Sequence, residues 1–248
     1  MLIVDNARRA LAAVPVVFAV VVLAACGSDH NGSSTGTAVS ETTGAAAVQA
    51  QYTKVVSDVS PQVVQIQTDQ GLGSGIVFDA NGHIVTNAHV TGNAKRFLVT
   101  LAGGDRRQAS LVGADPRNDL AIIHVSGGSP APAAFADSTG VRPGEIVFAI
   151  GNPLGLQSSV TQGIVSSINR EVTEGNGVTL SNVLQTSAEI NPGNSGGALV
   201  DLFGRVIGIP TLAALDPEFG NAQAPGIGFA IPSTKVQQVA ERLIGEGT

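Results

Sequence analysis

Short runs of apolar and β-branched residues recur along the chain from about Tyr52 onward, and turn-forming residues separate them. The turns include Asn81-Gly82, Asp115-Pro116 and Phe203-Gly204. Many short strands at near-regular spacing, with few helical patterns, are typical of β-sandwiches and β-barrels. The pattern therefore predicts an all-β protein. The runs that predict strands are 63–66, 75–78, 84–86, 97–99, 120–125, 146–150, 163–165, 198–200, 206–209 and 227–231.

One helix is expected at the end of this region. Pro232-Ser233 is a helix start signal, the apolar residues from Val236 to Leu243 fall on one face at helical spacing, and Gly245 ends the pattern. We therefore expect a helix over about 233–244. A stretch rich in Gly, Pro and Ser at 127–144 is a candidate connection between two halves, about 55–135 and about 140–232.

The first 25 residues have the pattern of an export signal. Arg8 and Arg9 precede an apolar stretch of 14 residues, which is short for a membrane span. The stretch ends in Leu23-Ala24-Ala25-Cys26, which resembles a bacterial lipobox. The resemblance implies cleavage before Cys26, lipidation of Cys26 and anchoring at the outer face of the cell membrane. An uncleaved anchor and a plain secretory signal are the alternatives.

The segment 26–52 is rich in Gly, Ser, Thr and Ala and has almost no large apolar side chain. Such a composition does not offset the entropy cost of ordering the chain. We therefore expect a flexible tether over 26–52, with His30 solvated and without a role. The folded domain is expected over 53–248.

Composition and charge exclude several classes of function. The 248 residues include 13 basic and 19 acidic residues and no run of Lys or Arg, so a basic face for nucleic acid is not expected. The single cysteine allows no intrachain disulfide and no cysteine-based metal cluster. The four scattered histidines do not favour zinc. We expect no metal and no cofactor.

The segment 191–197, Asn-Pro-Gly-Asn-Ser-Gly-Gly, packs glycines around Ser195. A nucleophilic serine needs a sharp turn that exposes its hydroxyl, and backbone N–H groups directed at the carbonyl oxygen under attack. Glycines on both sides of the serine allow that access. The alternative is a Gly-rich turn that only connects two strands.

Chain order separates the serine hydrolase types. An α/β-hydrolase has the order Ser, acid, His, but all four histidines of this chain precede Ser195. An esterase of that type is therefore disfavoured. The order His, Asp, Ser remains, which is the order in chymotrypsin-like enzymes with two β-barrels. The strand pattern and the chain order agree on this fold.

The histidine and aspartate partners are chosen by position. His89 is expected at the end of a strand over 84–89, where a rigid element can hold an imidazole. His83 follows a turn and is expected to be exposed, and His124 lies within a strand. Asp119 precedes an apolar strand, where a partly buried carboxylate could orient the imidazole. Asp115, in an Asp-Pro turn, is the weaker rival.

Three segments resemble the catalytic motifs of HtrA/Deg serine proteases: 86–90 (TNAHV), 118–122 (NDLAI) and 193–199 (GNSGGAL). Four others resemble scaffold motifs of the same branch: 73–75 (GSG), 149–155 (AIGNPLG), 161–166 (TQGIVS) and 226–232 (GIGFAIP). The resemblance implies two six-stranded antiparallel β-barrels with a C-terminal helix. It implies His89 as general base, Asp119 as its orienting group and Ser195 as nucleophile. The oxyanion hole is expected at Gly193 and Ser195, with Asn194 assisting.

The resemblance also implies substrates and setting. We expect an endopeptidase that cleaves unfolded or damaged envelope proteins, and a homotrimer is one assembly to test. A chaperone-like module that binds peptides with little proteolysis is the alternative. Members of this branch usually carry a PDZ domain after the protease, whereas this sequence continues only through the expected helix. The segment 73–75 is interpreted as tight strand packing.

The substrate pocket carries a departure from the family. Ile190, Thr211, Leu212, Ala213 and Ala214 match positions that line the substrate groove and the S1 pocket, so an aliphatic residue before the cut is expected. Glu189 stands at a position that lies at the base of the S1 pocket in this superfamily, where the HtrA branch usually has a small residue. A carboxylate that points into the pocket would instead favour Lys or Arg. The alternative is a solvated glutamate at the rim.

Overall fold

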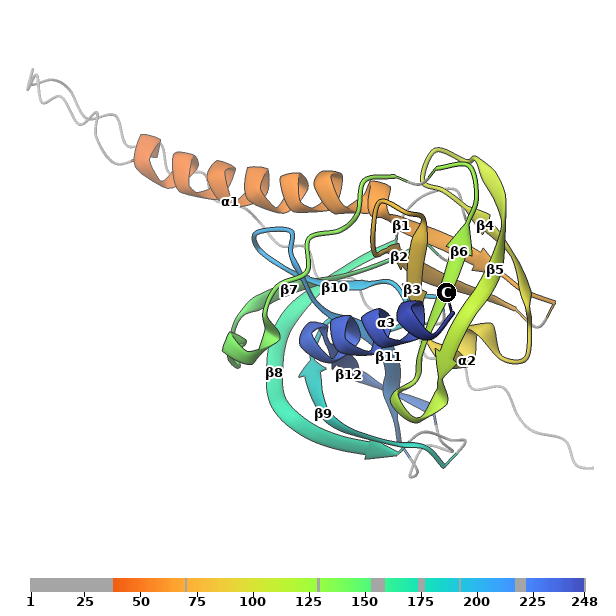
Figure 1. The fold of residues 1–248 in the computed structure, drawn as a ribbon. Coiled ribbons are helices and arrows are strands. Elements are labelled where there is room, and N and C mark those ends of the chain that lie inside the picture. Colours follow the sequence, from red (N-terminus) through yellow and green to blue (C-terminus); the bar gives the residue numbers. More distant parts are fainter. Residues whose placement is uncertain are drawn as a thin grey trace, which may run out of the picture. The chain divides into compact units, whose positions relative to one another are not determined.

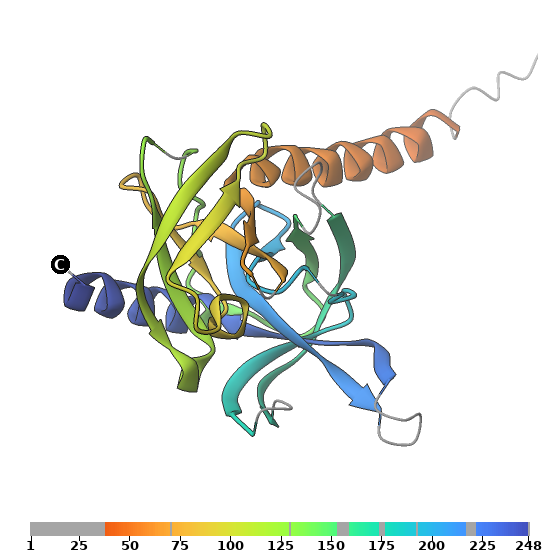
Figure 2. The ribbon, with the colours of Figure 1, turned by 90° about the vertical axis from the view of Figure 1, so that its right-hand side faces the viewer.

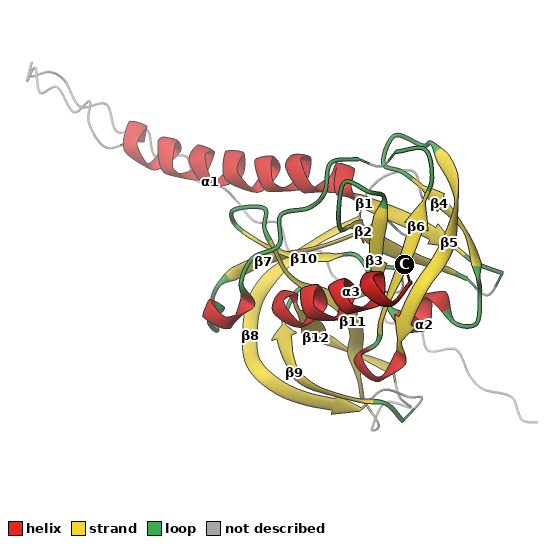
Figure 3. Cartoon of the chain, viewed as in Figure 1, coloured by secondary structure: helices red, strands yellow, loops and turns green. Residues whose placement is uncertain are grey.

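The computed structural model describes residues 38–69, 71–128, 130–152, 159–173, 177–191, 193–216 and 222–247. The expected export signal at 1–25, Cys26 and His30 lie outside the described residues. Strands predominate in the described part of the chain (Figure 3). Within the described residues, no helix is both long enough and apolar enough to cross a bilayer.

Six antiparallel strands form a first closed barrel in the order β1-β2-β3-β6-β5-β4 (Figure 1). The register pairs Val63 with Ile76, Ile76 with Val85, and Val85 with Ile122. The strands are β1 (Val63–Gln67), β2 (Leu72–Val77), β3 (His83–Thr86), β4 (Arg96–Thr100), β5 (Arg106–Asp115) and β6 (Leu120–Val125). A short helix, α2 (Ala88–Thr91), follows β3.

Six further antiparallel strands form a second closed barrel in the order β10-β11-β12-β9-β8-β7. The strands are β7 (Ile146–Gly151), β8 (Ser159–Thr173), β9 (Thr179–Thr186), β10 (Ala198–Asp201), β11 (Val206–Asp216) and β12 (Ala222–Pro232). The expected fold of two six-stranded barrels is confirmed. Strands β5 and β9 were not expected from the apolar runs.

Alternation along the strands divides the apolar side chains between separate cores. Successive residues of a strand point to opposite faces. Ile123 packs with other residues of the first barrel, whereas its neighbour Ile122 joins a cluster that also contains Phe148 and Ile150 of the second barrel. A third cluster is built around the second barrel. The Ile122 cluster therefore holds the two barrels together.

Helix α1 (Ala38–Val59) occupies part of the segment that we expected to be flexible, so the expectation of a tether over 26–52 is wrong from residue 38 onward. The sequence Ala45-Ala46-Ala47-Val48-Gln49 is rich in good helix formers. At the other end of the helix, Val55 and Val59 are buried in the cluster between the barrels. Propensity and burial together outweigh the entropy cost of ordering this stretch.

Helix α3 (Ser233–Gly247) follows the second barrel and packs against both barrels. It contacts β5 and β6 of the first barrel and β11 and β12 of the second (Figures 1 and 2). Leu243 is buried and lies against Gly113. The helix continues past Gly245, which was expected to end it. A Cβ atom at Gly247 would lie 2.8 Å from Cγ1 of Val112, so the last turn of the helix lies against β5.

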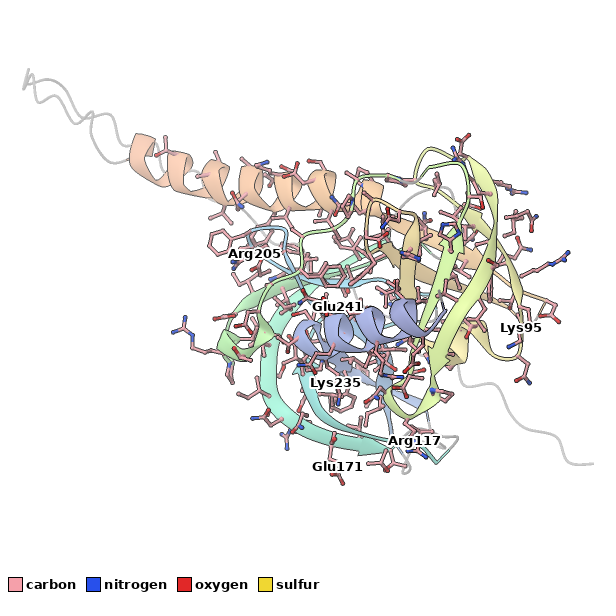
Figure 4. The ribbon with its side chains drawn as sticks, in the orientation of Figure 1. Lys95, Arg117, Glu171, Arg205, Lys235 and Glu241 are labelled. Atoms are coloured by element: carbon pink, nitrogen blue, oxygen red, sulfur yellow. The ribbon has the colours of Figure 1, made fainter. Side chains whose placement is uncertain are left out.

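Exposed positive charges lie on different elements of the structure (Figure 4). Lys95 precedes β4, Arg117 lies in a 3₁₀ helix before β6, Arg205 lies between β10 and β11, and Lys235 lies on α3. Arg205 is paired with Asp201 at 2.7 Å. The expectation that nucleic acid is not a partner stays a prediction.

Candidate active site

His89 lies on helix α2, directly after β3. We expected it at the end of a continuous strand over 84–89, and this is wrong, because β3 ends at Thr86. Asn87 then has extended backbone, with φ −78° and ψ 148°. Its side chain donates to the carbonyl of Asp119 at 3.0 Å and makes no cap of the helix. The chain therefore turns at Asn87 and brings His89 next to Asp119.

Asp119 lies in the left-handed region, with φ 49° and ψ 43°, between a 3₁₀ helix at 116–118 and β6. Its side chain is 3% exposed. Oδ2 and Oδ1 lie 2.9 and 3.0 Å from Nδ1 of His89, and the backbone N–H of His89 donates to Oδ1 at 3.0 Å. The His89 side chain is 39% exposed, so the imidazole is in contact with both the carboxylate and solvent.

Thr211 connects Asp119 to Ser195. The Thr211 hydroxyl donates to Oδ2 of Asp119 at 2.5 Å, and the Thr211 carbonyl accepts a hydrogen bond from Oγ of Ser195 at 2.9 Å. Thr211 itself is 2% exposed. We expected Thr211 in the substrate pocket, and the structure places it between the candidate aspartate and the candidate nucleophile. The three candidate triad residues thus lie in one hydrogen-bonded region.

The loop 191–197, which we call the nucleophile loop, precedes β10 and carries Ser195. Two of its glycines have backbone conformations that other residues avoid: φ is +100° at Gly193 and +81° at Gly196. A Cβ atom at Gly196 would lie 2.2 Å from the carbonyl oxygen of Ser74. Only glycine fits there, so the first barrel approaches the backbone of the loop closely.

Asn194 is buried and shapes the nucleophile loop from within. Its backbone N–H donates to the carbonyl of Asn191 at 3.0 Å, and its side-chain amide donates to the carbonyl of Glu189 at 3.4 Å. Among the residues that the structure describes, the N–H groups of Gly193 and Ser195 have no hydrogen-bond partner. Two backbone donors therefore remain for an oxygen atom of a ligand.

His83 is bound to a carboxylate away from the nucleophile loop. Its side chain is 14% exposed, which corrects the expectation that it is exposed, because Nδ1 lies 2.7 Å from Oδ2 of Asp79. Burial alone would raise the pKa of Asp79. The hydrogen bonds and charge of His83 and the N–H of Asn81 outweigh it, so the pKa of Asp79 lies below its ordinary value.

Asp115 and His124 take part in local structure. Asp115 accepts from the backbone N–H of Asn118 and caps the 3₁₀ helix that precedes Asp119. It also pairs with Arg242 of α3 at 2.5 Å. The Nε2 atom of His124 lies 3.0 Å from the carbonyl oxygen of Asn81. Neither residue lies in the hydrogen-bonded region around Ser195.

A cavity of about 140 Å³ lies beside the nucleophile loop, since Asn191 belongs to both. Its lining consists of Glu189, Ile190, Asn191, Ala224, Pro225, Gly226 and Ile227. The expected pocket residues Glu189 and Ile190 are among them. The expected residues Leu212, Ala213 and Ala214 lie in β11, and their side chains are outside what the structure describes.

Sequence reasoning missed the contribution of β12 to this cavity. The segment 226–232 resembles a scaffold motif, and its first residues line the cavity together with Ile190. A Cβ atom at Gly228 would lie 2.4 Å from Cγ1 of Ile190. The glycine therefore lets β12 approach Ile190, and the glycines of the segment 226–232 are the sequence signal that could have indicated this pocket wall.

Comparison with known families identifies this arrangement. A family model described as a trypsin-like peptidase domain matches residues 73–209, which is more than half of the chain. The chain belongs to the trypsin-like peptidase family. The matched range contains His89, Asp119 and Ser195.

Relatives within the family place the chain near the HtrA and Deg proteases. Serine protease PepD of Mycobacterium tuberculosis is 40% identical over an alignment of 215 positions, gaps included, and the alignment covers 78% of this chain and 46% of that protein. Periplasmic serine endoprotease DegP of Escherichia coli is 45% identical over 185 residues, which are 74% of this chain and 38% of that protein. The resemblance to the HtrA/Deg branch is confirmed. The chain spans less than half the length of these relatives.

A solved structure supports the same assignment within the family. The structure described as HtrA-type protease AlgW with tripeptide aligns with a TM-score of 0.71 and 38% sequence identity. The alignment covers 79% of this chain and 64% of that chain. The chymotrypsin-like arrangement of two barrels is therefore shared with an HtrA-type protease.

Proposed function

We propose that this member of the family is a serine endopeptidase with His89 as general base, Asp119 as its orienting group and Ser195 as nucleophile. The observation that carries the proposal is the buried carboxylate of Asp119, which lies 2.9 Å from Nδ1 of His89. A carboxylate at Nδ1 selects the tautomer in which Nε2 can accept a proton, and it stabilises the imidazolium that forms.

The proposed reaction proceeds through an acyl-enzyme. Oγ of Ser195 attacks the carbonyl carbon of the scissile bond and gives its proton to Nε2 of His89. The N–H groups of Gly193 and Ser195 donate to the oxyanion of the tetrahedral intermediate. The imidazolium protonates the leaving amine as the C–N bond breaks, and water repeats the sequence to release the acid. Each of these steps is carried out by groups of the protein and by water.

The proposed substrates carry a small or medium aliphatic residue before the cut. Ile190, Ala224 and Ile227 give the cavity beside the nucleophile loop an apolar lining, and its volume is about 140 Å³. Glu189 lines the same cavity and is exposed, so water can solvate its carboxylate. Discrimination by apolar contacts is weak, about 1–3 kcal/mol per methylene. Aliphatic side chains are buried in folded proteins, so unfolded chains are the substrates that present them.

A profile of cleavage products by mass spectrometry tests this preference. We expect Val, Ala and Leu to be enriched before the cut, with little change in a Glu189→Ala variant. A strong excess of Lys or Arg before the cut, lost in Glu189→Ala, would show that the carboxylate of Glu189 binds the substrate.

The proposed setting is the cell envelope, with the protease anchored through a lipid on Cys26 after cleavage of residues 1–25. The sequence Leu23-Ala24-Ala25-Cys26 supports the anchor, and the relative DegP is by name a periplasmic protease. Unfolded or damaged envelope proteins are the proposed substrates, and a homotrimer is the proposed assembly.

Cell fractionation of a Cys26→Ala variant tests the anchor. The variant should be found in the soluble fraction and should retain its activity. If it stays in the membrane pellet, an uncleaved helix is the anchor.

Digestion of unfolded casein by the wild-type protein and by Ser195→Ala tests the proposed activity. We expect cleavage by the wild type only, and labelling of the wild type only by a fluorophosphonate probe. If casein is bound by both proteins and cleaved by neither, the chain is a chaperone-like module and the proposed activity is wrong.

A further inference from the structure

Ser74, on β2 of the first barrel, is fully buried and uses all of its polar groups in hydrogen bonds. Its backbone N–H donates to the carbonyl of Ser195 at 3.0 Å, and its hydroxyl donates to the carbonyl of Gly193 at 2.5 Å. Its own carbonyl accepts from the hydroxyl of Thr86 at 2.6 Å. One residue of the first barrel therefore holds two carbonyls of the nucleophile loop.

The direction of the Ser74 hydroxyl is fixed by a third segment. The backbone N–H of Asn152, the residue that follows β7, donates to Oγ of Ser74 at 2.8 Å. A serine hydroxyl has one proton to give. Because the hydroxyl accepts from Asn152, its own proton is directed to the carbonyl of Gly193. The contact thus joins β2, β7 and the nucleophile loop.

Because peptide bonds are planar, the hydrogen bonds from Ser74 also fix the direction of the Ser195 N–H, one of the two proposed oxyanion donors. The Ser195 N–H belongs to the peptide group that joins residues 194 and 195. The peptide groups before and after it contain the carbonyls of Gly193 and Ser195, and Ser74 binds both. Each peptide group is a rigid plane. The plane that carries the Ser195 N–H is therefore held between two fixed planes.

The Gly193 N–H depends on the same contact. It belongs to the peptide group before Gly193, which is separated from the fixed carbonyl by the two dihedral angles of Gly193 alone. Gly193 has φ +100°, a region that glycine enters and leaves without a steric barrier from Cβ. Without the Ser74 hydroxyl, the carbonyl of Gly193 would lose its partner from the first barrel, and rotation at this glycine would turn the N–H away.

We propose that Ser74 is a positioning residue for the oxyanion hole: it orients the N–H groups of Gly193 and Ser195 through hydrogen bonds to the two carbonyls beside them. This inference rests on the proposed function. Ser74 touches neither the substrate nor the reacting atoms. Its effect is on the stabilisation of the tetrahedral intermediate, so it should change kcat and leave KM unchanged.

The test compares Ser74→Ala with a matched control, Ser233→Ala. Ser233 is also fully buried, and its hydroxyl donates to the carbonyl of Ala136 at 2.7 Å, away from the nucleophile loop. We expect kcat for a peptide substrate to fall about 10- to 100-fold in Ser74→Ala, less than the loss of an oxyanion donor itself. KM should change less than about twofold. Ser233→Ala should lower the thermal midpoint similarly and keep kcat near the wild-type value.

Inhibition by a peptide trifluoromethyl ketone separates positioning from general destabilisation. This compound forms a tetrahedral oxyanion with the nucleophile, so its Ki should rise in Ser74→Ala by the same factor by which kcat falls. A kcat within about threefold of the Ser233→Ala value, or a loss confined to KM, would overturn the proposal.

A second variant keeps the test valid if Ser74→Ala does not fold. Ser74→Cys retains a weaker donor of similar shape and should give an intermediate kcat. A folded Ser74→Cys protein with the wild-type kcat and Ki would contradict the proposal. Ser195→Ala separates a failure of the proposed function from a failure of the proposed role of Ser74. If it remains active, the proposed function fails; if it is inactive while Ser74→Ala is fully active, only the role of Ser74 fails.

Discussion

The two barrels hold their parts of the candidate site in different ways. In the first barrel, His89 and Asp119 lie on short elements at the ends of β3 and β6, and they bind each other directly at 2.9 Å. In the second barrel, Ser195 lies on a loop whose carbonyls bind a residue of the other barrel. The contact between His89 and Asp119 is thus made within one barrel, and the second barrel adds one hydrogen bond to it, from Thr211 to Asp119, whereas the nucleophile loop is held directly by a residue of the opposite barrel.

The largest expected effect comes from removing one proposed catalytic group from each barrel, Ser195 from the second or His89 from the first. Ser195→Ala and His89→Ala should each lower kcat by about 10⁴–10⁶, since the members of a triad act as a unit. The double variant should be scarcely worse than either single variant. Initial rates with a peptide substrate give the comparison. A Ser195→Ala variant that keeps more than a tenth of the activity would show that another residue is the nucleophile.

Adjacent residues of β6 test whether the contact between the barrels matters for activity. Ile122 packs in the cluster between the barrels and Ile123 packs within the first barrel, and both are fully buried. Alanine at either position should cost about 2–5 kcal/mol in the free energy of unfolding. Urea titrations measure that cost, and kcat is then measured on the folded protein. We expect the larger loss of kcat for Ile122→Ala. Equal losses would show that the division between barrels has no catalytic consequence.

Thr211 offers a smaller test of the link between the barrels. Thr211→Val removes the hydroxyl that donates to Asp119 and keeps the carbonyl that accepts from Ser195. Loss of a hydrogen bond to a charged group costs about 1.5–3 kcal/mol, so kcat should fall about 10- to 100-fold. Thr211→Ser retains the hydroxyl and should retain most of the activity. An active Thr211→Val variant would mean that Asp119 is held by the first barrel alone.

The smallest expected effect is confined to the first barrel. The pKa of Asp79 is lowered in the folded protein, so this carboxylate stabilises the fold above its unfolded pKa, about 3.9, and the contribution is lost as the pH falls through the folded value. Asp79→Asn should therefore be less stable than the wild type at pH 7, and the two should converge in strong acid. Thermal melts across pH measure this difference. We expect kcat at pH 7 to be unchanged in Asp79→Asn, which would show that Asp79 is not part of the active site.

The strands that the sequence could predict are those whose apolar residues are contiguous. β5 was missed because its burial is irregular and a bulge lies between Leu111 and Gly113, so neither alternation nor an apolar run is visible. β9 was missed because it mixes polar and apolar positions and contains Asn182 with φ +60°. Helix α1 was mistaken for a tether because its contacts with the core are made by its last turns, at Val55 and Val59.

The candidate triad could be predicted because His89, Asp119 and Ser195 each lie in a recognisable local motif. The contacts that connect them could not. Thr211 and Asp119 are 92 positions apart in the chain, and Ser74 and Gly193 are 119 apart. Such pairs meet only because the two barrels pack together, and no local pattern of residues records that packing.

The packing of α3 across both barrels has a consequence for the order of folding. Arg242, near the end of α3, pairs with Asp115, which caps the turn just before Asp119, and the two are 127 positions apart. Contacts between residues so distant in the chain close large loops. Closure of a large loop is slow because the chain loses conformational entropy before the stabilising contacts form. A folding intermediate with two formed barrels and an undocked α3 would therefore lack the ion pair between Arg242 and Asp115 beside Asp119. During refolding, peptidase activity would then be recovered in a late kinetic phase, after most of the β-structure has formed.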